Sequence, residues 1–413
     1  MKRNCLNSIT FYKMVKKFKS RNENFGKVVF DPNNFKHFLM TEQQYNEFSK
    51  NNDVEEMSNN LSKAGSGFLY SPIRTYFDLT LACNLRCRTC LNSSDKALND
   101  ELSLEQAIDV VEGLAKDSVF DIRFSGGEPT LKLGWEEILN KAKELGMTFS
   151  LNSNGIYADS QTVDKIIKIN PDEISISIDG YKKHNDSIRG KGNYNKAEET
   201  VKALSSAGCR VTINSAVTSI LDESDIRGLL ELANDYCKDI SFFHARPLGR
   251  ALRIKDKLLS YHEINDFMDK VEQIKLEYPT LVVRTRSSSL KQNAINQSSA
   301  TDFSLMEGGT DGFTRFNIMS NGDLYAGGCV LYVDPNMKQQ LVLGNIVDEN
   351  YSLLNVWRNS ERLYQIRQKS LKHKQKCNIC MDYEKKCHGF TLEMELYDKI
   401  HGNNPYCIKS RGD

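Results

Sequence analysis

Short apolar segments alternate with amphipathic helical segments from residue 73 to about 285, and this alternation limits the fold more than any other feature. The apolar segments are each followed by Gly, Asn or Asp, which is typical of strands that end in turns. Strands are predicted at 74–81, 119–125, 147–153, 173–179, 210–217 and 239–246. Alternation of this kind implies parallel strands joined by right-handed crossovers. The fold class is therefore α/β, with six βα units in an incomplete (β/α)6 TIM-like barrel or an open doubly wound sheet.

The segment that follows the first strand has the pattern of a helix with one apolar face. Ala107, Val110, Val111 and Leu114 recur at helical spacing, and Ser103 is placed to cap the first turn. A helix is therefore predicted between the first two strands.

Residues 1–66 differ from this core and are predicted to form a small accessory module. The first 22 residues contain seven Lys or Arg and no acid. The helical spacing of Ile9, Tyr12, Val15 and Phe18 indicates a basic amphipathic helix or, alternatively, a solvated arm. A hairpin is predicted from 26–31 and 36–40, followed by a helix from Thr41. The core is assigned to 73–285, and a cysteine-rich α+β tail domain to 310–413. Within the tail, a hairpin is predicted at 314–328 and a helix at 353–367.

Composition excludes several classes of protein. The chain has 55 Lys and Arg against 54 Asp and Glu, so its net charge of +1 gives no reason to expect a nucleic acid or a membrane as partner. No apolar run reaches the roughly 18 residues of a membrane span. Eleven cysteines favour metal or redox chemistry over a disulfide framework, and the expected location is cytoplasmic.

The polar motifs lie directly after predicted strands. A cysteine motif follows the first strand, Ser-Gly-Gly-Glu-Pro the second, Asn-Ser-Asn-Gly the third and Ile-Asp-Gly the fourth. Barrels and open α/β sheets both place their active sites at the carboxyl ends of their strands. The chemistry is therefore expected at this end of the sheet.

The cysteine motif consists of Cys83, Cys87 and Cys90, separated by three and then two residues. Three thiolates at this spacing can hold three irons of a cubane cluster and leave the fourth iron open to another ligand. A zinc loop is the alternative, but a closed structural zinc site needs a fourth protein ligand, and no cysteine or histidine is adjacent.

These three cysteines resemble the CxxxCxxC motif of the radical SAM superfamily, and the resemblance extends over residues 73–250. It implies that Cys83, Cys87 and Cys90 bind a 4Fe-4S cluster whose open iron takes S-adenosyl-L-methionine (SAM). One electron from the cluster then cleaves SAM to a 5′-deoxyadenosyl radical. The sequence departs from the family at Thr89, where an aromatic residue usually faces the adenine.

Gly126, Gly127, Glu128 and Pro129 resemble the family's GGEP segment. Glycines allow close backbone approach, and a carboxylate suits an ammonium group, so this segment is expected to hold the methionine amine. Four further residues resemble SAM-binding positions less specifically. Ser177 and Arg189 are expected at the methionine carboxylate, and Asp179 and Asn154 are candidates for the ribose hydroxyls, with turn or cap roles as the alternative.

The tail carries a second cysteine set that resembles the SPASM extension of radical SAM enzymes. Four thiolates suit either zinc or a 4Fe-4S cluster, and the resemblance implies one auxiliary 4Fe-4S cluster. Its expected ligands are Cys377, Cys380, Cys387 and Cys407.

A second, inner auxiliary cluster is not expected. Cys329 occupies its first ligand position, but Thr391 and Glu349 stand near positions where other members have cysteine. Cys329 and His244 are the two weak catalytic candidates, each with a buried structural role as the alternative.

The resemblance implies a radical SAM enzyme that abstracts hydrogen from a peptide or protein, most simply in the maturation of a ribosomally made peptide. Its partners are then the peptide and an electron donor such as a flavodoxin or ferredoxin. The accessory module is weakly similar to the leader-binding domains of such maturases. The alternatives are a sulfatase-activating type of side-chain maturase, a radical enzyme for a small molecule, and a non-enzymatic iron–sulfur or zinc protein.

Overall fold

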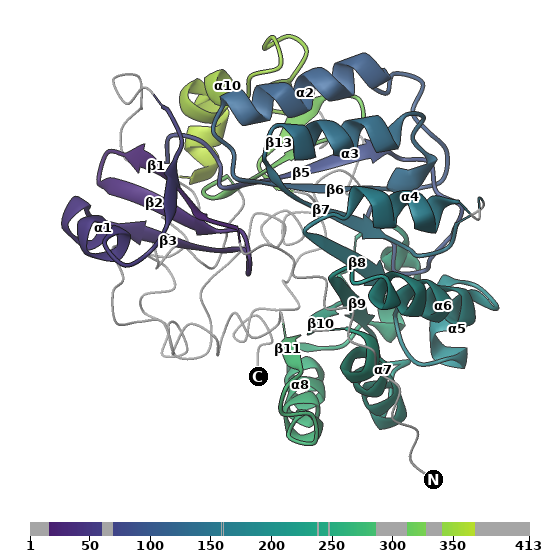
Figure 1. The fold of residues 1–413 in the computed structure, drawn as a ribbon. Coiled ribbons are helices and arrows are strands. Elements are labelled where there is room, and N and C mark those ends of the chain that lie inside the picture. The colour runs from purple at the N-terminus through teal and green to yellow at the C-terminus, as the bar shows by residue number, and fades with distance from the viewer. Residues whose placement is uncertain are drawn as a thin grey trace, which may run out of the picture.

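We describe the protein from a computed structural model, in which the described residues are 16–59, 69–157, 159, 161–237, 239–246, 248–285, 312–327 and 341–367. These residues form a ten-stranded sheet, a four-stranded sheet and the helices around them (Figure 1). None of the described helices combines the length and apolar character that crossing a membrane requires.

The large sheet contains all six predicted strands of the core. Its strands are β5 (Arg74–Thr80), β6 (Asp121–Gly126), β7 (Thr148–Ser153), β8 (Glu173–Ser177), β9 (Val211–Val217), β10 (Asp239–His244), β11 (Val282–Thr285), β12 (Arg315–Ile318), β13 (Asp323–Tyr325) and β14 (Gly344–Asn345). Neighbouring strands from β5 to β11 are parallel and follow one another in chain order. A doubly wound sheet would reverse its order at a switch point. The incomplete TIM-like barrel is thus confirmed.

Helices connect the strands and cover one face of the sheet (Figure 1). They are α2 (Leu104–Lys116), α3 (Trp135–Glu144), α4 (Thr162–Ile169), α5 (Lys183–Arg189), α6 (Asn193–Ser206), α7 (Glu223–Tyr236) and α8 (Tyr261–Lys275). The predicted cap is present at α2, where the Ser103 hydroxyl accepts from the Gln106 N–H and the Gln106 side chain bonds back to Ser103. The predicted apolar face of α2 is buried against the sheet.

The alternation of side chains along the strands separates an apolar face from a polar one. Phe77 and Phe124 lie 6.3 Å apart between ring centres and belong to the core under the helices. Because successive side chains point to opposite faces, Asp78 and Arg123 lie on the inner face of the barrel. The inner face therefore carries charge, and the carboxyl ends of the strands open onto the candidate site.

The predicted hairpin at the start of the tail is present as β12 and β13, which pair antiparallel. Its first strand also pairs with β5 in parallel, so the tail extends the barrel's own sheet, which the sequence pattern did not indicate. The predicted helix 353–367 is divided, since α10 (Leu354–Asn359) ends at Ser360, where the backbone is extended.

The N-terminal module is a four-stranded sheet in the order β3-β2-β1-β4, with one helix. Its elements are β1 (Phe18–Glu23), β2 (Gly26–Asp31), β3 (Lys36–Met40), α1 (Glu42–Ser49) and β4 (Val54–Glu56). The predicted hairpin and helix are confirmed. The predicted amphipathic helix is wrong at Phe18, which begins β1, while residues 1–15 lie outside the described part of the chain.

The helical interpretation fails in β1 because the segment is a strand, and the solvated-arm interpretation fails because its basic residues are buried. Arg21 is 1% exposed, pairs with Glu23 at 2.7 Å and donates to the carbonyls of Ser71, Pro72 and Ser118 at the barrel. Arg21 therefore attaches the N-terminal module to the barrel.

The turn between β2 and β3 packs against the amino-terminal end of the barrel. Phe35 is 9% exposed, and its ring centre lies 4.3 Å from the Arg123 guanidinium and 5.0 Å from that of Arg210. The Phe35 carbonyl accepts from Arg74 at 3.5 Å. The module is therefore joined to the barrel at the end opposite the candidate site.

Candidate functional site

The loop after β5 carries the three cysteines predicted to bind the cluster. Cys83 and Cys90 are partly buried, Cys87 is buried, and all three are free. Burial raises the pKa of Cys87 to about 11; Arg189 opposes this rise, and the other two cysteines add to it. Such thiols ionise readily only when a cation, such as a bound metal, stabilises the thiolate, and the proton is then released. The donor set therefore fits a thiolate-binding metal cluster.

The loop is held in place by Arg250, which follows β10. The Arg250 Nε donates to the Cys87 carbonyl at 2.8 Å, and its backbone N–H donates to the Cys90 carbonyl at 3.0 Å. Gly249 has φ +58°, and a Cβ there would lie 2.2 Å from the Leu91 carbonyl oxygen. Both residues thus fix the backbone that carries the cysteines.

Sequence reasoning missed this contact. Arginines in a polar loop usually face solvent, so Arg250 gave no signal of its own. The glycine directly before it was the available sign, because a Gly-Arg pair beyond a strand allows a close backbone approach followed by a long donor.

Gly126 and Gly127 lie against the backbone that leads into the cysteine loop. Gly126 has φ +129°, and the Gly127 N–H donates to the Thr80 carbonyl at 2.7 Å. A Cβ at Gly127 would lie 2.1 Å from the Ala82 carbonyl oxygen. These glycines therefore allow two segments of the backbone of this chain to approach each other closely.

Glu128 is fully buried beside the carboxyl end of β7. Its carboxylate accepts from the Thr130 hydroxyl at 2.9 Å, the Ser153 hydroxyl at 3.0 Å and the Asn154 N–H at 2.8 Å. Burial raises its pKa, and these donors oppose that rise. A cationic ligand would favour the ionised form further.

Asn154 lies between Glu128 and the cysteine loop. Its Nδ2 donates to Asn84 Oδ1 at 2.8 Å and lies 3.9 Å from the Cys83 sulfur. Its Oδ1 accepts from the Ile156 N–H at 2.7 Å. The side chain is thus oriented by protein partners on both of its polar atoms.

Asp179 and Arg189 form a buried ion pair at the ends of β8 and α5. The Asp179 Oδ2 lies 2.9 Å from Arg189 Nε and accepts from the Thr89 hydroxyl at 3.1 Å. The Asp179 Oδ1 accepts from the Ala216 N–H at 2.8 Å. Arg189 Nη1 in turn lies 3.9 Å from the Cys87 sulfur. The structure therefore brings together residues predicted separately as SAM contacts and as metal ligands.

Ser177 and His244 occupy the ends of their strands. Ser177 is half-buried at the end of β8. His244 ends β10, where burial and then Arg246 lower its pKa to about 3. The imidazole is therefore neutral at physiological pH, and this pKa suits a structural residue better than a general base.

The remaining candidates lie outside the described residues. These are Cys329 and the predicted auxiliary ligands Cys377, Cys380, Cys387 and Cys407. Their assignments stay predictions.

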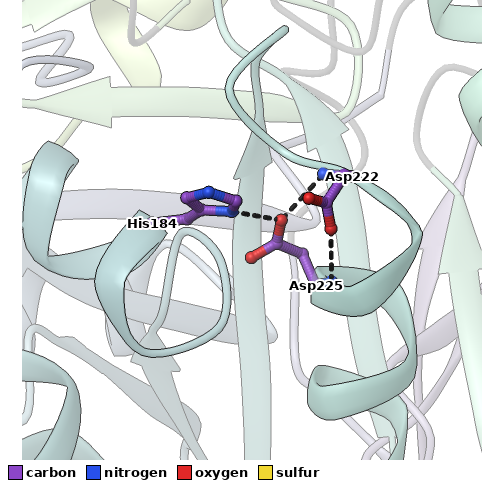
Figure 2. Close-up of side chains that lie close together, drawn as sticks. All are labelled: His184, Asp222 and Asp225. Carbon is purple, nitrogen blue, oxygen red and sulfur yellow. Dashed lines mark hydrogen bonds and ion pairs between the residues drawn. The ribbon is translucent and has the colours of Figure 1, made fainter.

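Within the described residues, one further cluster of metal-binding residue types occurs away from this site. Side-chain atoms of His184, Asp222 and Asp225 lie within 4.8 Å of one another (Figure 2). Asp222 caps α7 through the N–H groups of Ser224 and Asp225, and the Asp225 carboxylate accepts from the Asp222 and Tyr181 N–H groups. Hydrogen bonds within the chain thus account for both carboxylates, and the group fits a capping role.

Comparison with known families agrees with the motifs. Residues 78–233 match the Radical SAM superfamily. Residues 310–382 match the SPASM iron–sulfur cluster-binding domain.

Individual relatives cover most of the chain. The mycofactocin maturase MftC of Mycolicibacterium smegmatis is 26% identical over 83% of this chain and 84% of its own length. The sporulation killing factor maturation protein SkfB of Bacillus subtilis is 29% identical over 70% of this chain and 66% of its own. The fold is similar to that of Streptococcus suis SuiB bound to its precursor peptide SuiA, with TM-score 0.68 and 17% identity over 86% of this chain and 91% of SuiB.

Proposed function

The chain is a radical SAM enzyme with a SPASM iron–sulfur domain, and we propose that it matures a ribosomally made peptide. Enzymes of this kind use SAM, a 4Fe-4S cluster that binds SAM, and an auxiliary 4Fe-4S cluster. The observation that carries the proposal is the convergence of three free cysteines, Glu128 and Arg189 on one end of the barrel. The peptide class rests on the names of the relatives MftC and SkfB, which are maturases.

We assign Cys83, Cys87 and Cys90 as the ligands of the SAM-binding cluster. When bound, the cluster and SAM supply a 5′-deoxyadenosyl radical that abstracts hydrogen from the substrate. Glu128 suits the methionine amine, because its buried carboxylate gains a cationic partner. Arg189 suits the methionine carboxylate, because a guanidinium has five N–H donors and Asp179 and Cys87 engage only two of its nitrogens.

We place the precursor peptide's leader along β3. In the described part of the chain, β3 is an outer strand of the N-terminal sheet and pairs only with β2. Phe38 on this strand is 41% exposed. An edge strand offers backbone groups to an extended peptide, and exposed side chains beside it add specificity.

One further partner, the electron donor, and the location follow from this chemistry. A flavodoxin or ferredoxin supplies the electron that the cluster delivers. Iron–sulfur clusters and free thiols suit a reducing compartment, so we place the enzyme in the cytoplasm.

The test is SAM cleavage by the anaerobically reconstituted protein under a chemical reductant. Replacing Cys83, Cys87 and Cys90 together by Ala should abolish 5′-deoxyadenosine formation, because no thiolate remains for the SAM-binding cluster. Replacing Cys209 and Cys237 by Ala is the matched control, since these cysteines lie just before β9 and β10, at the end of the barrel opposite this loop. The control should cleave SAM as the wild type does.

The substrate is tested with a precursor peptide encoded beside the gene for this chain. Mass spectrometry should detect a product that has lost hydrogen, or chiral amino-acid analysis should detect a stereochemical change at constant mass. Retained 5′-deoxyadenosine formation in the triple variant would reject the cluster assignment. SAM cleavage without any modification of the peptide would reject this peptide as the substrate.

A further inference from the structure

Two side-chain donors face the sulfur atoms of the cysteine loop. Asn154 Nδ2 lies 3.9 Å from the Cys83 sulfur, and Arg189 Nη1 lies 3.9 Å from the Cys87 sulfur. The backbone N–H of Leu85 donates to the Cys83 sulfur at 3.4 Å. Only Arg189 among these donors brings a full positive charge.

Asp179 holds Arg189 in this position, and other hydrogen bonds fix the Asp179 carboxylate in turn. Asp179 is fully buried, lies 2.9 Å from Arg189 Nε through Oδ2, and accepts from the Ala216 N–H at 2.8 Å through Oδ1. The Thr89 hydroxyl of the cysteine loop also donates to Asp179 Oδ2. The carboxylate therefore links β9, the cysteine loop and the guanidinium.

We propose that Arg189 raises the reduction potential of the SAM-binding cluster through the Cys87 sulfur, and that Asp179 is the positioning residue that holds it there. This proposal rests on the cluster assignment above. Reduction adds one negative charge to the cluster. A nearby cation and N–H groups directed at a ligand sulfur stabilise that added charge, and both are known determinants of cluster potential.

This role is separable from binding SAM. Nε of Arg189 lies at Asp179 and Nη1 at Cys87, and no described residue bonds to Nη2, which can therefore reach the methionine carboxylate. A potential measured before SAM is added therefore reports on the contact with Cys87 alone.

The test is a redox titration of the anaerobically reconstituted full chain without SAM, followed by electron paramagnetic resonance. Adding SAM at the end identifies the signal, because only the SAM-binding cluster changes its spectrum. Arg189→Gln should lower the midpoint potential while iron and sulfide content stay unchanged. Arg227→Gln is the matched control, since Arg227 is a surface arginine on α7 paired with Glu223 and Glu277, and it should leave the potential at the wild-type value.

Asp179→Asn tests the positioning. Because Arg189 is then no longer held, the midpoint potential should fall. The midpoint potential of the double variant with Arg189→Gln should be no lower than that of the single variants. Arg189→Lys retains the charge but not the planar fork, so its potential should lie between those of the wild type and Arg189→Gln. This variant also keeps the test decisive if Arg189→Gln loses iron.

Three outcomes would overturn the proposal or part of it. An unchanged potential in both Arg189 variants with full iron content would show that Arg189 does not affect the potential of the cluster. A raised potential in Asp179→Asn would mean that the carboxylate acts by its own charge and does not position Arg189. A cluster that persists in the triple cysteine variant and still responds to SAM would instead reject the cluster assignment.

Discussion

Asp78 is a buried carboxylate on the inner face of the barrel whose charge state depends on pH near neutrality. Burial raises its pKa to about 7, and the hydrogen bond from Asn92 Nδ2 at 3.2 Å opposes that rise. Asn92 also donates to the Gly126 carbonyl at 3.3 Å. Asp78 therefore lies in a network that joins β5, the cysteine loop and the glycine turn.

Asp78→Asn should stabilise the protein at alkaline pH. Between the ordinary pKa of 3.8 and about 7, the folded chain holds a proton that the unfolded chain releases. The free energy of unfolding therefore decreases as pH rises through this interval, and the loss is complete above it. Asn cannot ionise and still accepts from Asn92, so the variant should gain on the order of 2–4 kcal/mol at pH 8 and nothing at pH 4.

Thermal unfolding of both proteins between pH 4 and pH 8 provides the measurement. The difference in unfolding temperature should grow from zero as pH rises. A difference that does not change with pH would show that Asp78 does not titrate in this range.

At the residue scale, the sequence predicted where the chemistry lies better than which atoms meet. The strand-end rule placed Glu128, Asn154 and Asp179 at one end of the barrel, because parallel strands share their carboxyl edge. Arg189 was assigned from the family resemblance alone. Their partners were not predictable. Asp179 accepts hydrogen bonds from Ala216 and Thr89. These contacts depend on how far apart the segments lie in the fold, and the sequence pattern does not give that distance.

At the element scale, the turn between β2 and β3 closes the amino-terminal end of the barrel with an aromatic ring. Phe35 adopts φ +60°, which is uncommon for a residue other than glycine, and it lies between two guanidinium groups. Arg123 is itself paired with Glu173 at 2.7 Å. The turn therefore depends on a charge network that spans several strands.

Phe35→Ala should lower the stability of the folded chain by about 3 kcal/mol, because it removes a buried ring and its contacts with arginine. Phe38→Ala is the matched control, since Phe38 is exposed on the strand that follows the same turn. It should change stability by less than about 0.5 kcal/mol but reduce modification of the precursor peptide. Thermal unfolding and product yield, measured for both variants, separate the two roles.

Equal unfolding temperatures for these variants would show that the turn does not stabilise the barrel. Full product yield in Phe38→Ala would argue against a leader along β3. Deleting residues 1–66 would not separate these outcomes, because it would also expose the arginines that Phe35 covers.

The sequence predicted helices and strands correctly where apolar periodicity was clear, and wrongly where charged side chains are buried. The six core strands and α2 follow from apolar periodicity and a capping serine. β1 did not, because its polar alternation of Lys19, Arg21 and Glu23 is buried against the barrel, and sequence patterns assign such residues to solvent.

At the scale of the whole molecule, the protein should hold two 4Fe-4S clusters. The reconstituted wild type is expected to contain about eight irons per chain, and the triple variant of Cys83, Cys87 and Cys90 about four, because the tail has its own four cysteines. Iron and sulfide analysis of both proteins checks this. About twelve irons in the wild type would require a third cluster and ligands beyond those predicted.

The pairing of β12 with β5 has a consequence for synthesis on the ribosome. Arg74 in β5 pairs with Arg315 in β12, about 240 residues further along the chain. At ordinary elongation rates, the edge of β5 waits roughly 12–50 s for its partner. During that interval the neighbouring strands can assemble, while β5 and the cysteine loop after it remain at an open edge. The cysteine loop therefore stays beside an unpaired strand edge until the tail has been synthesised.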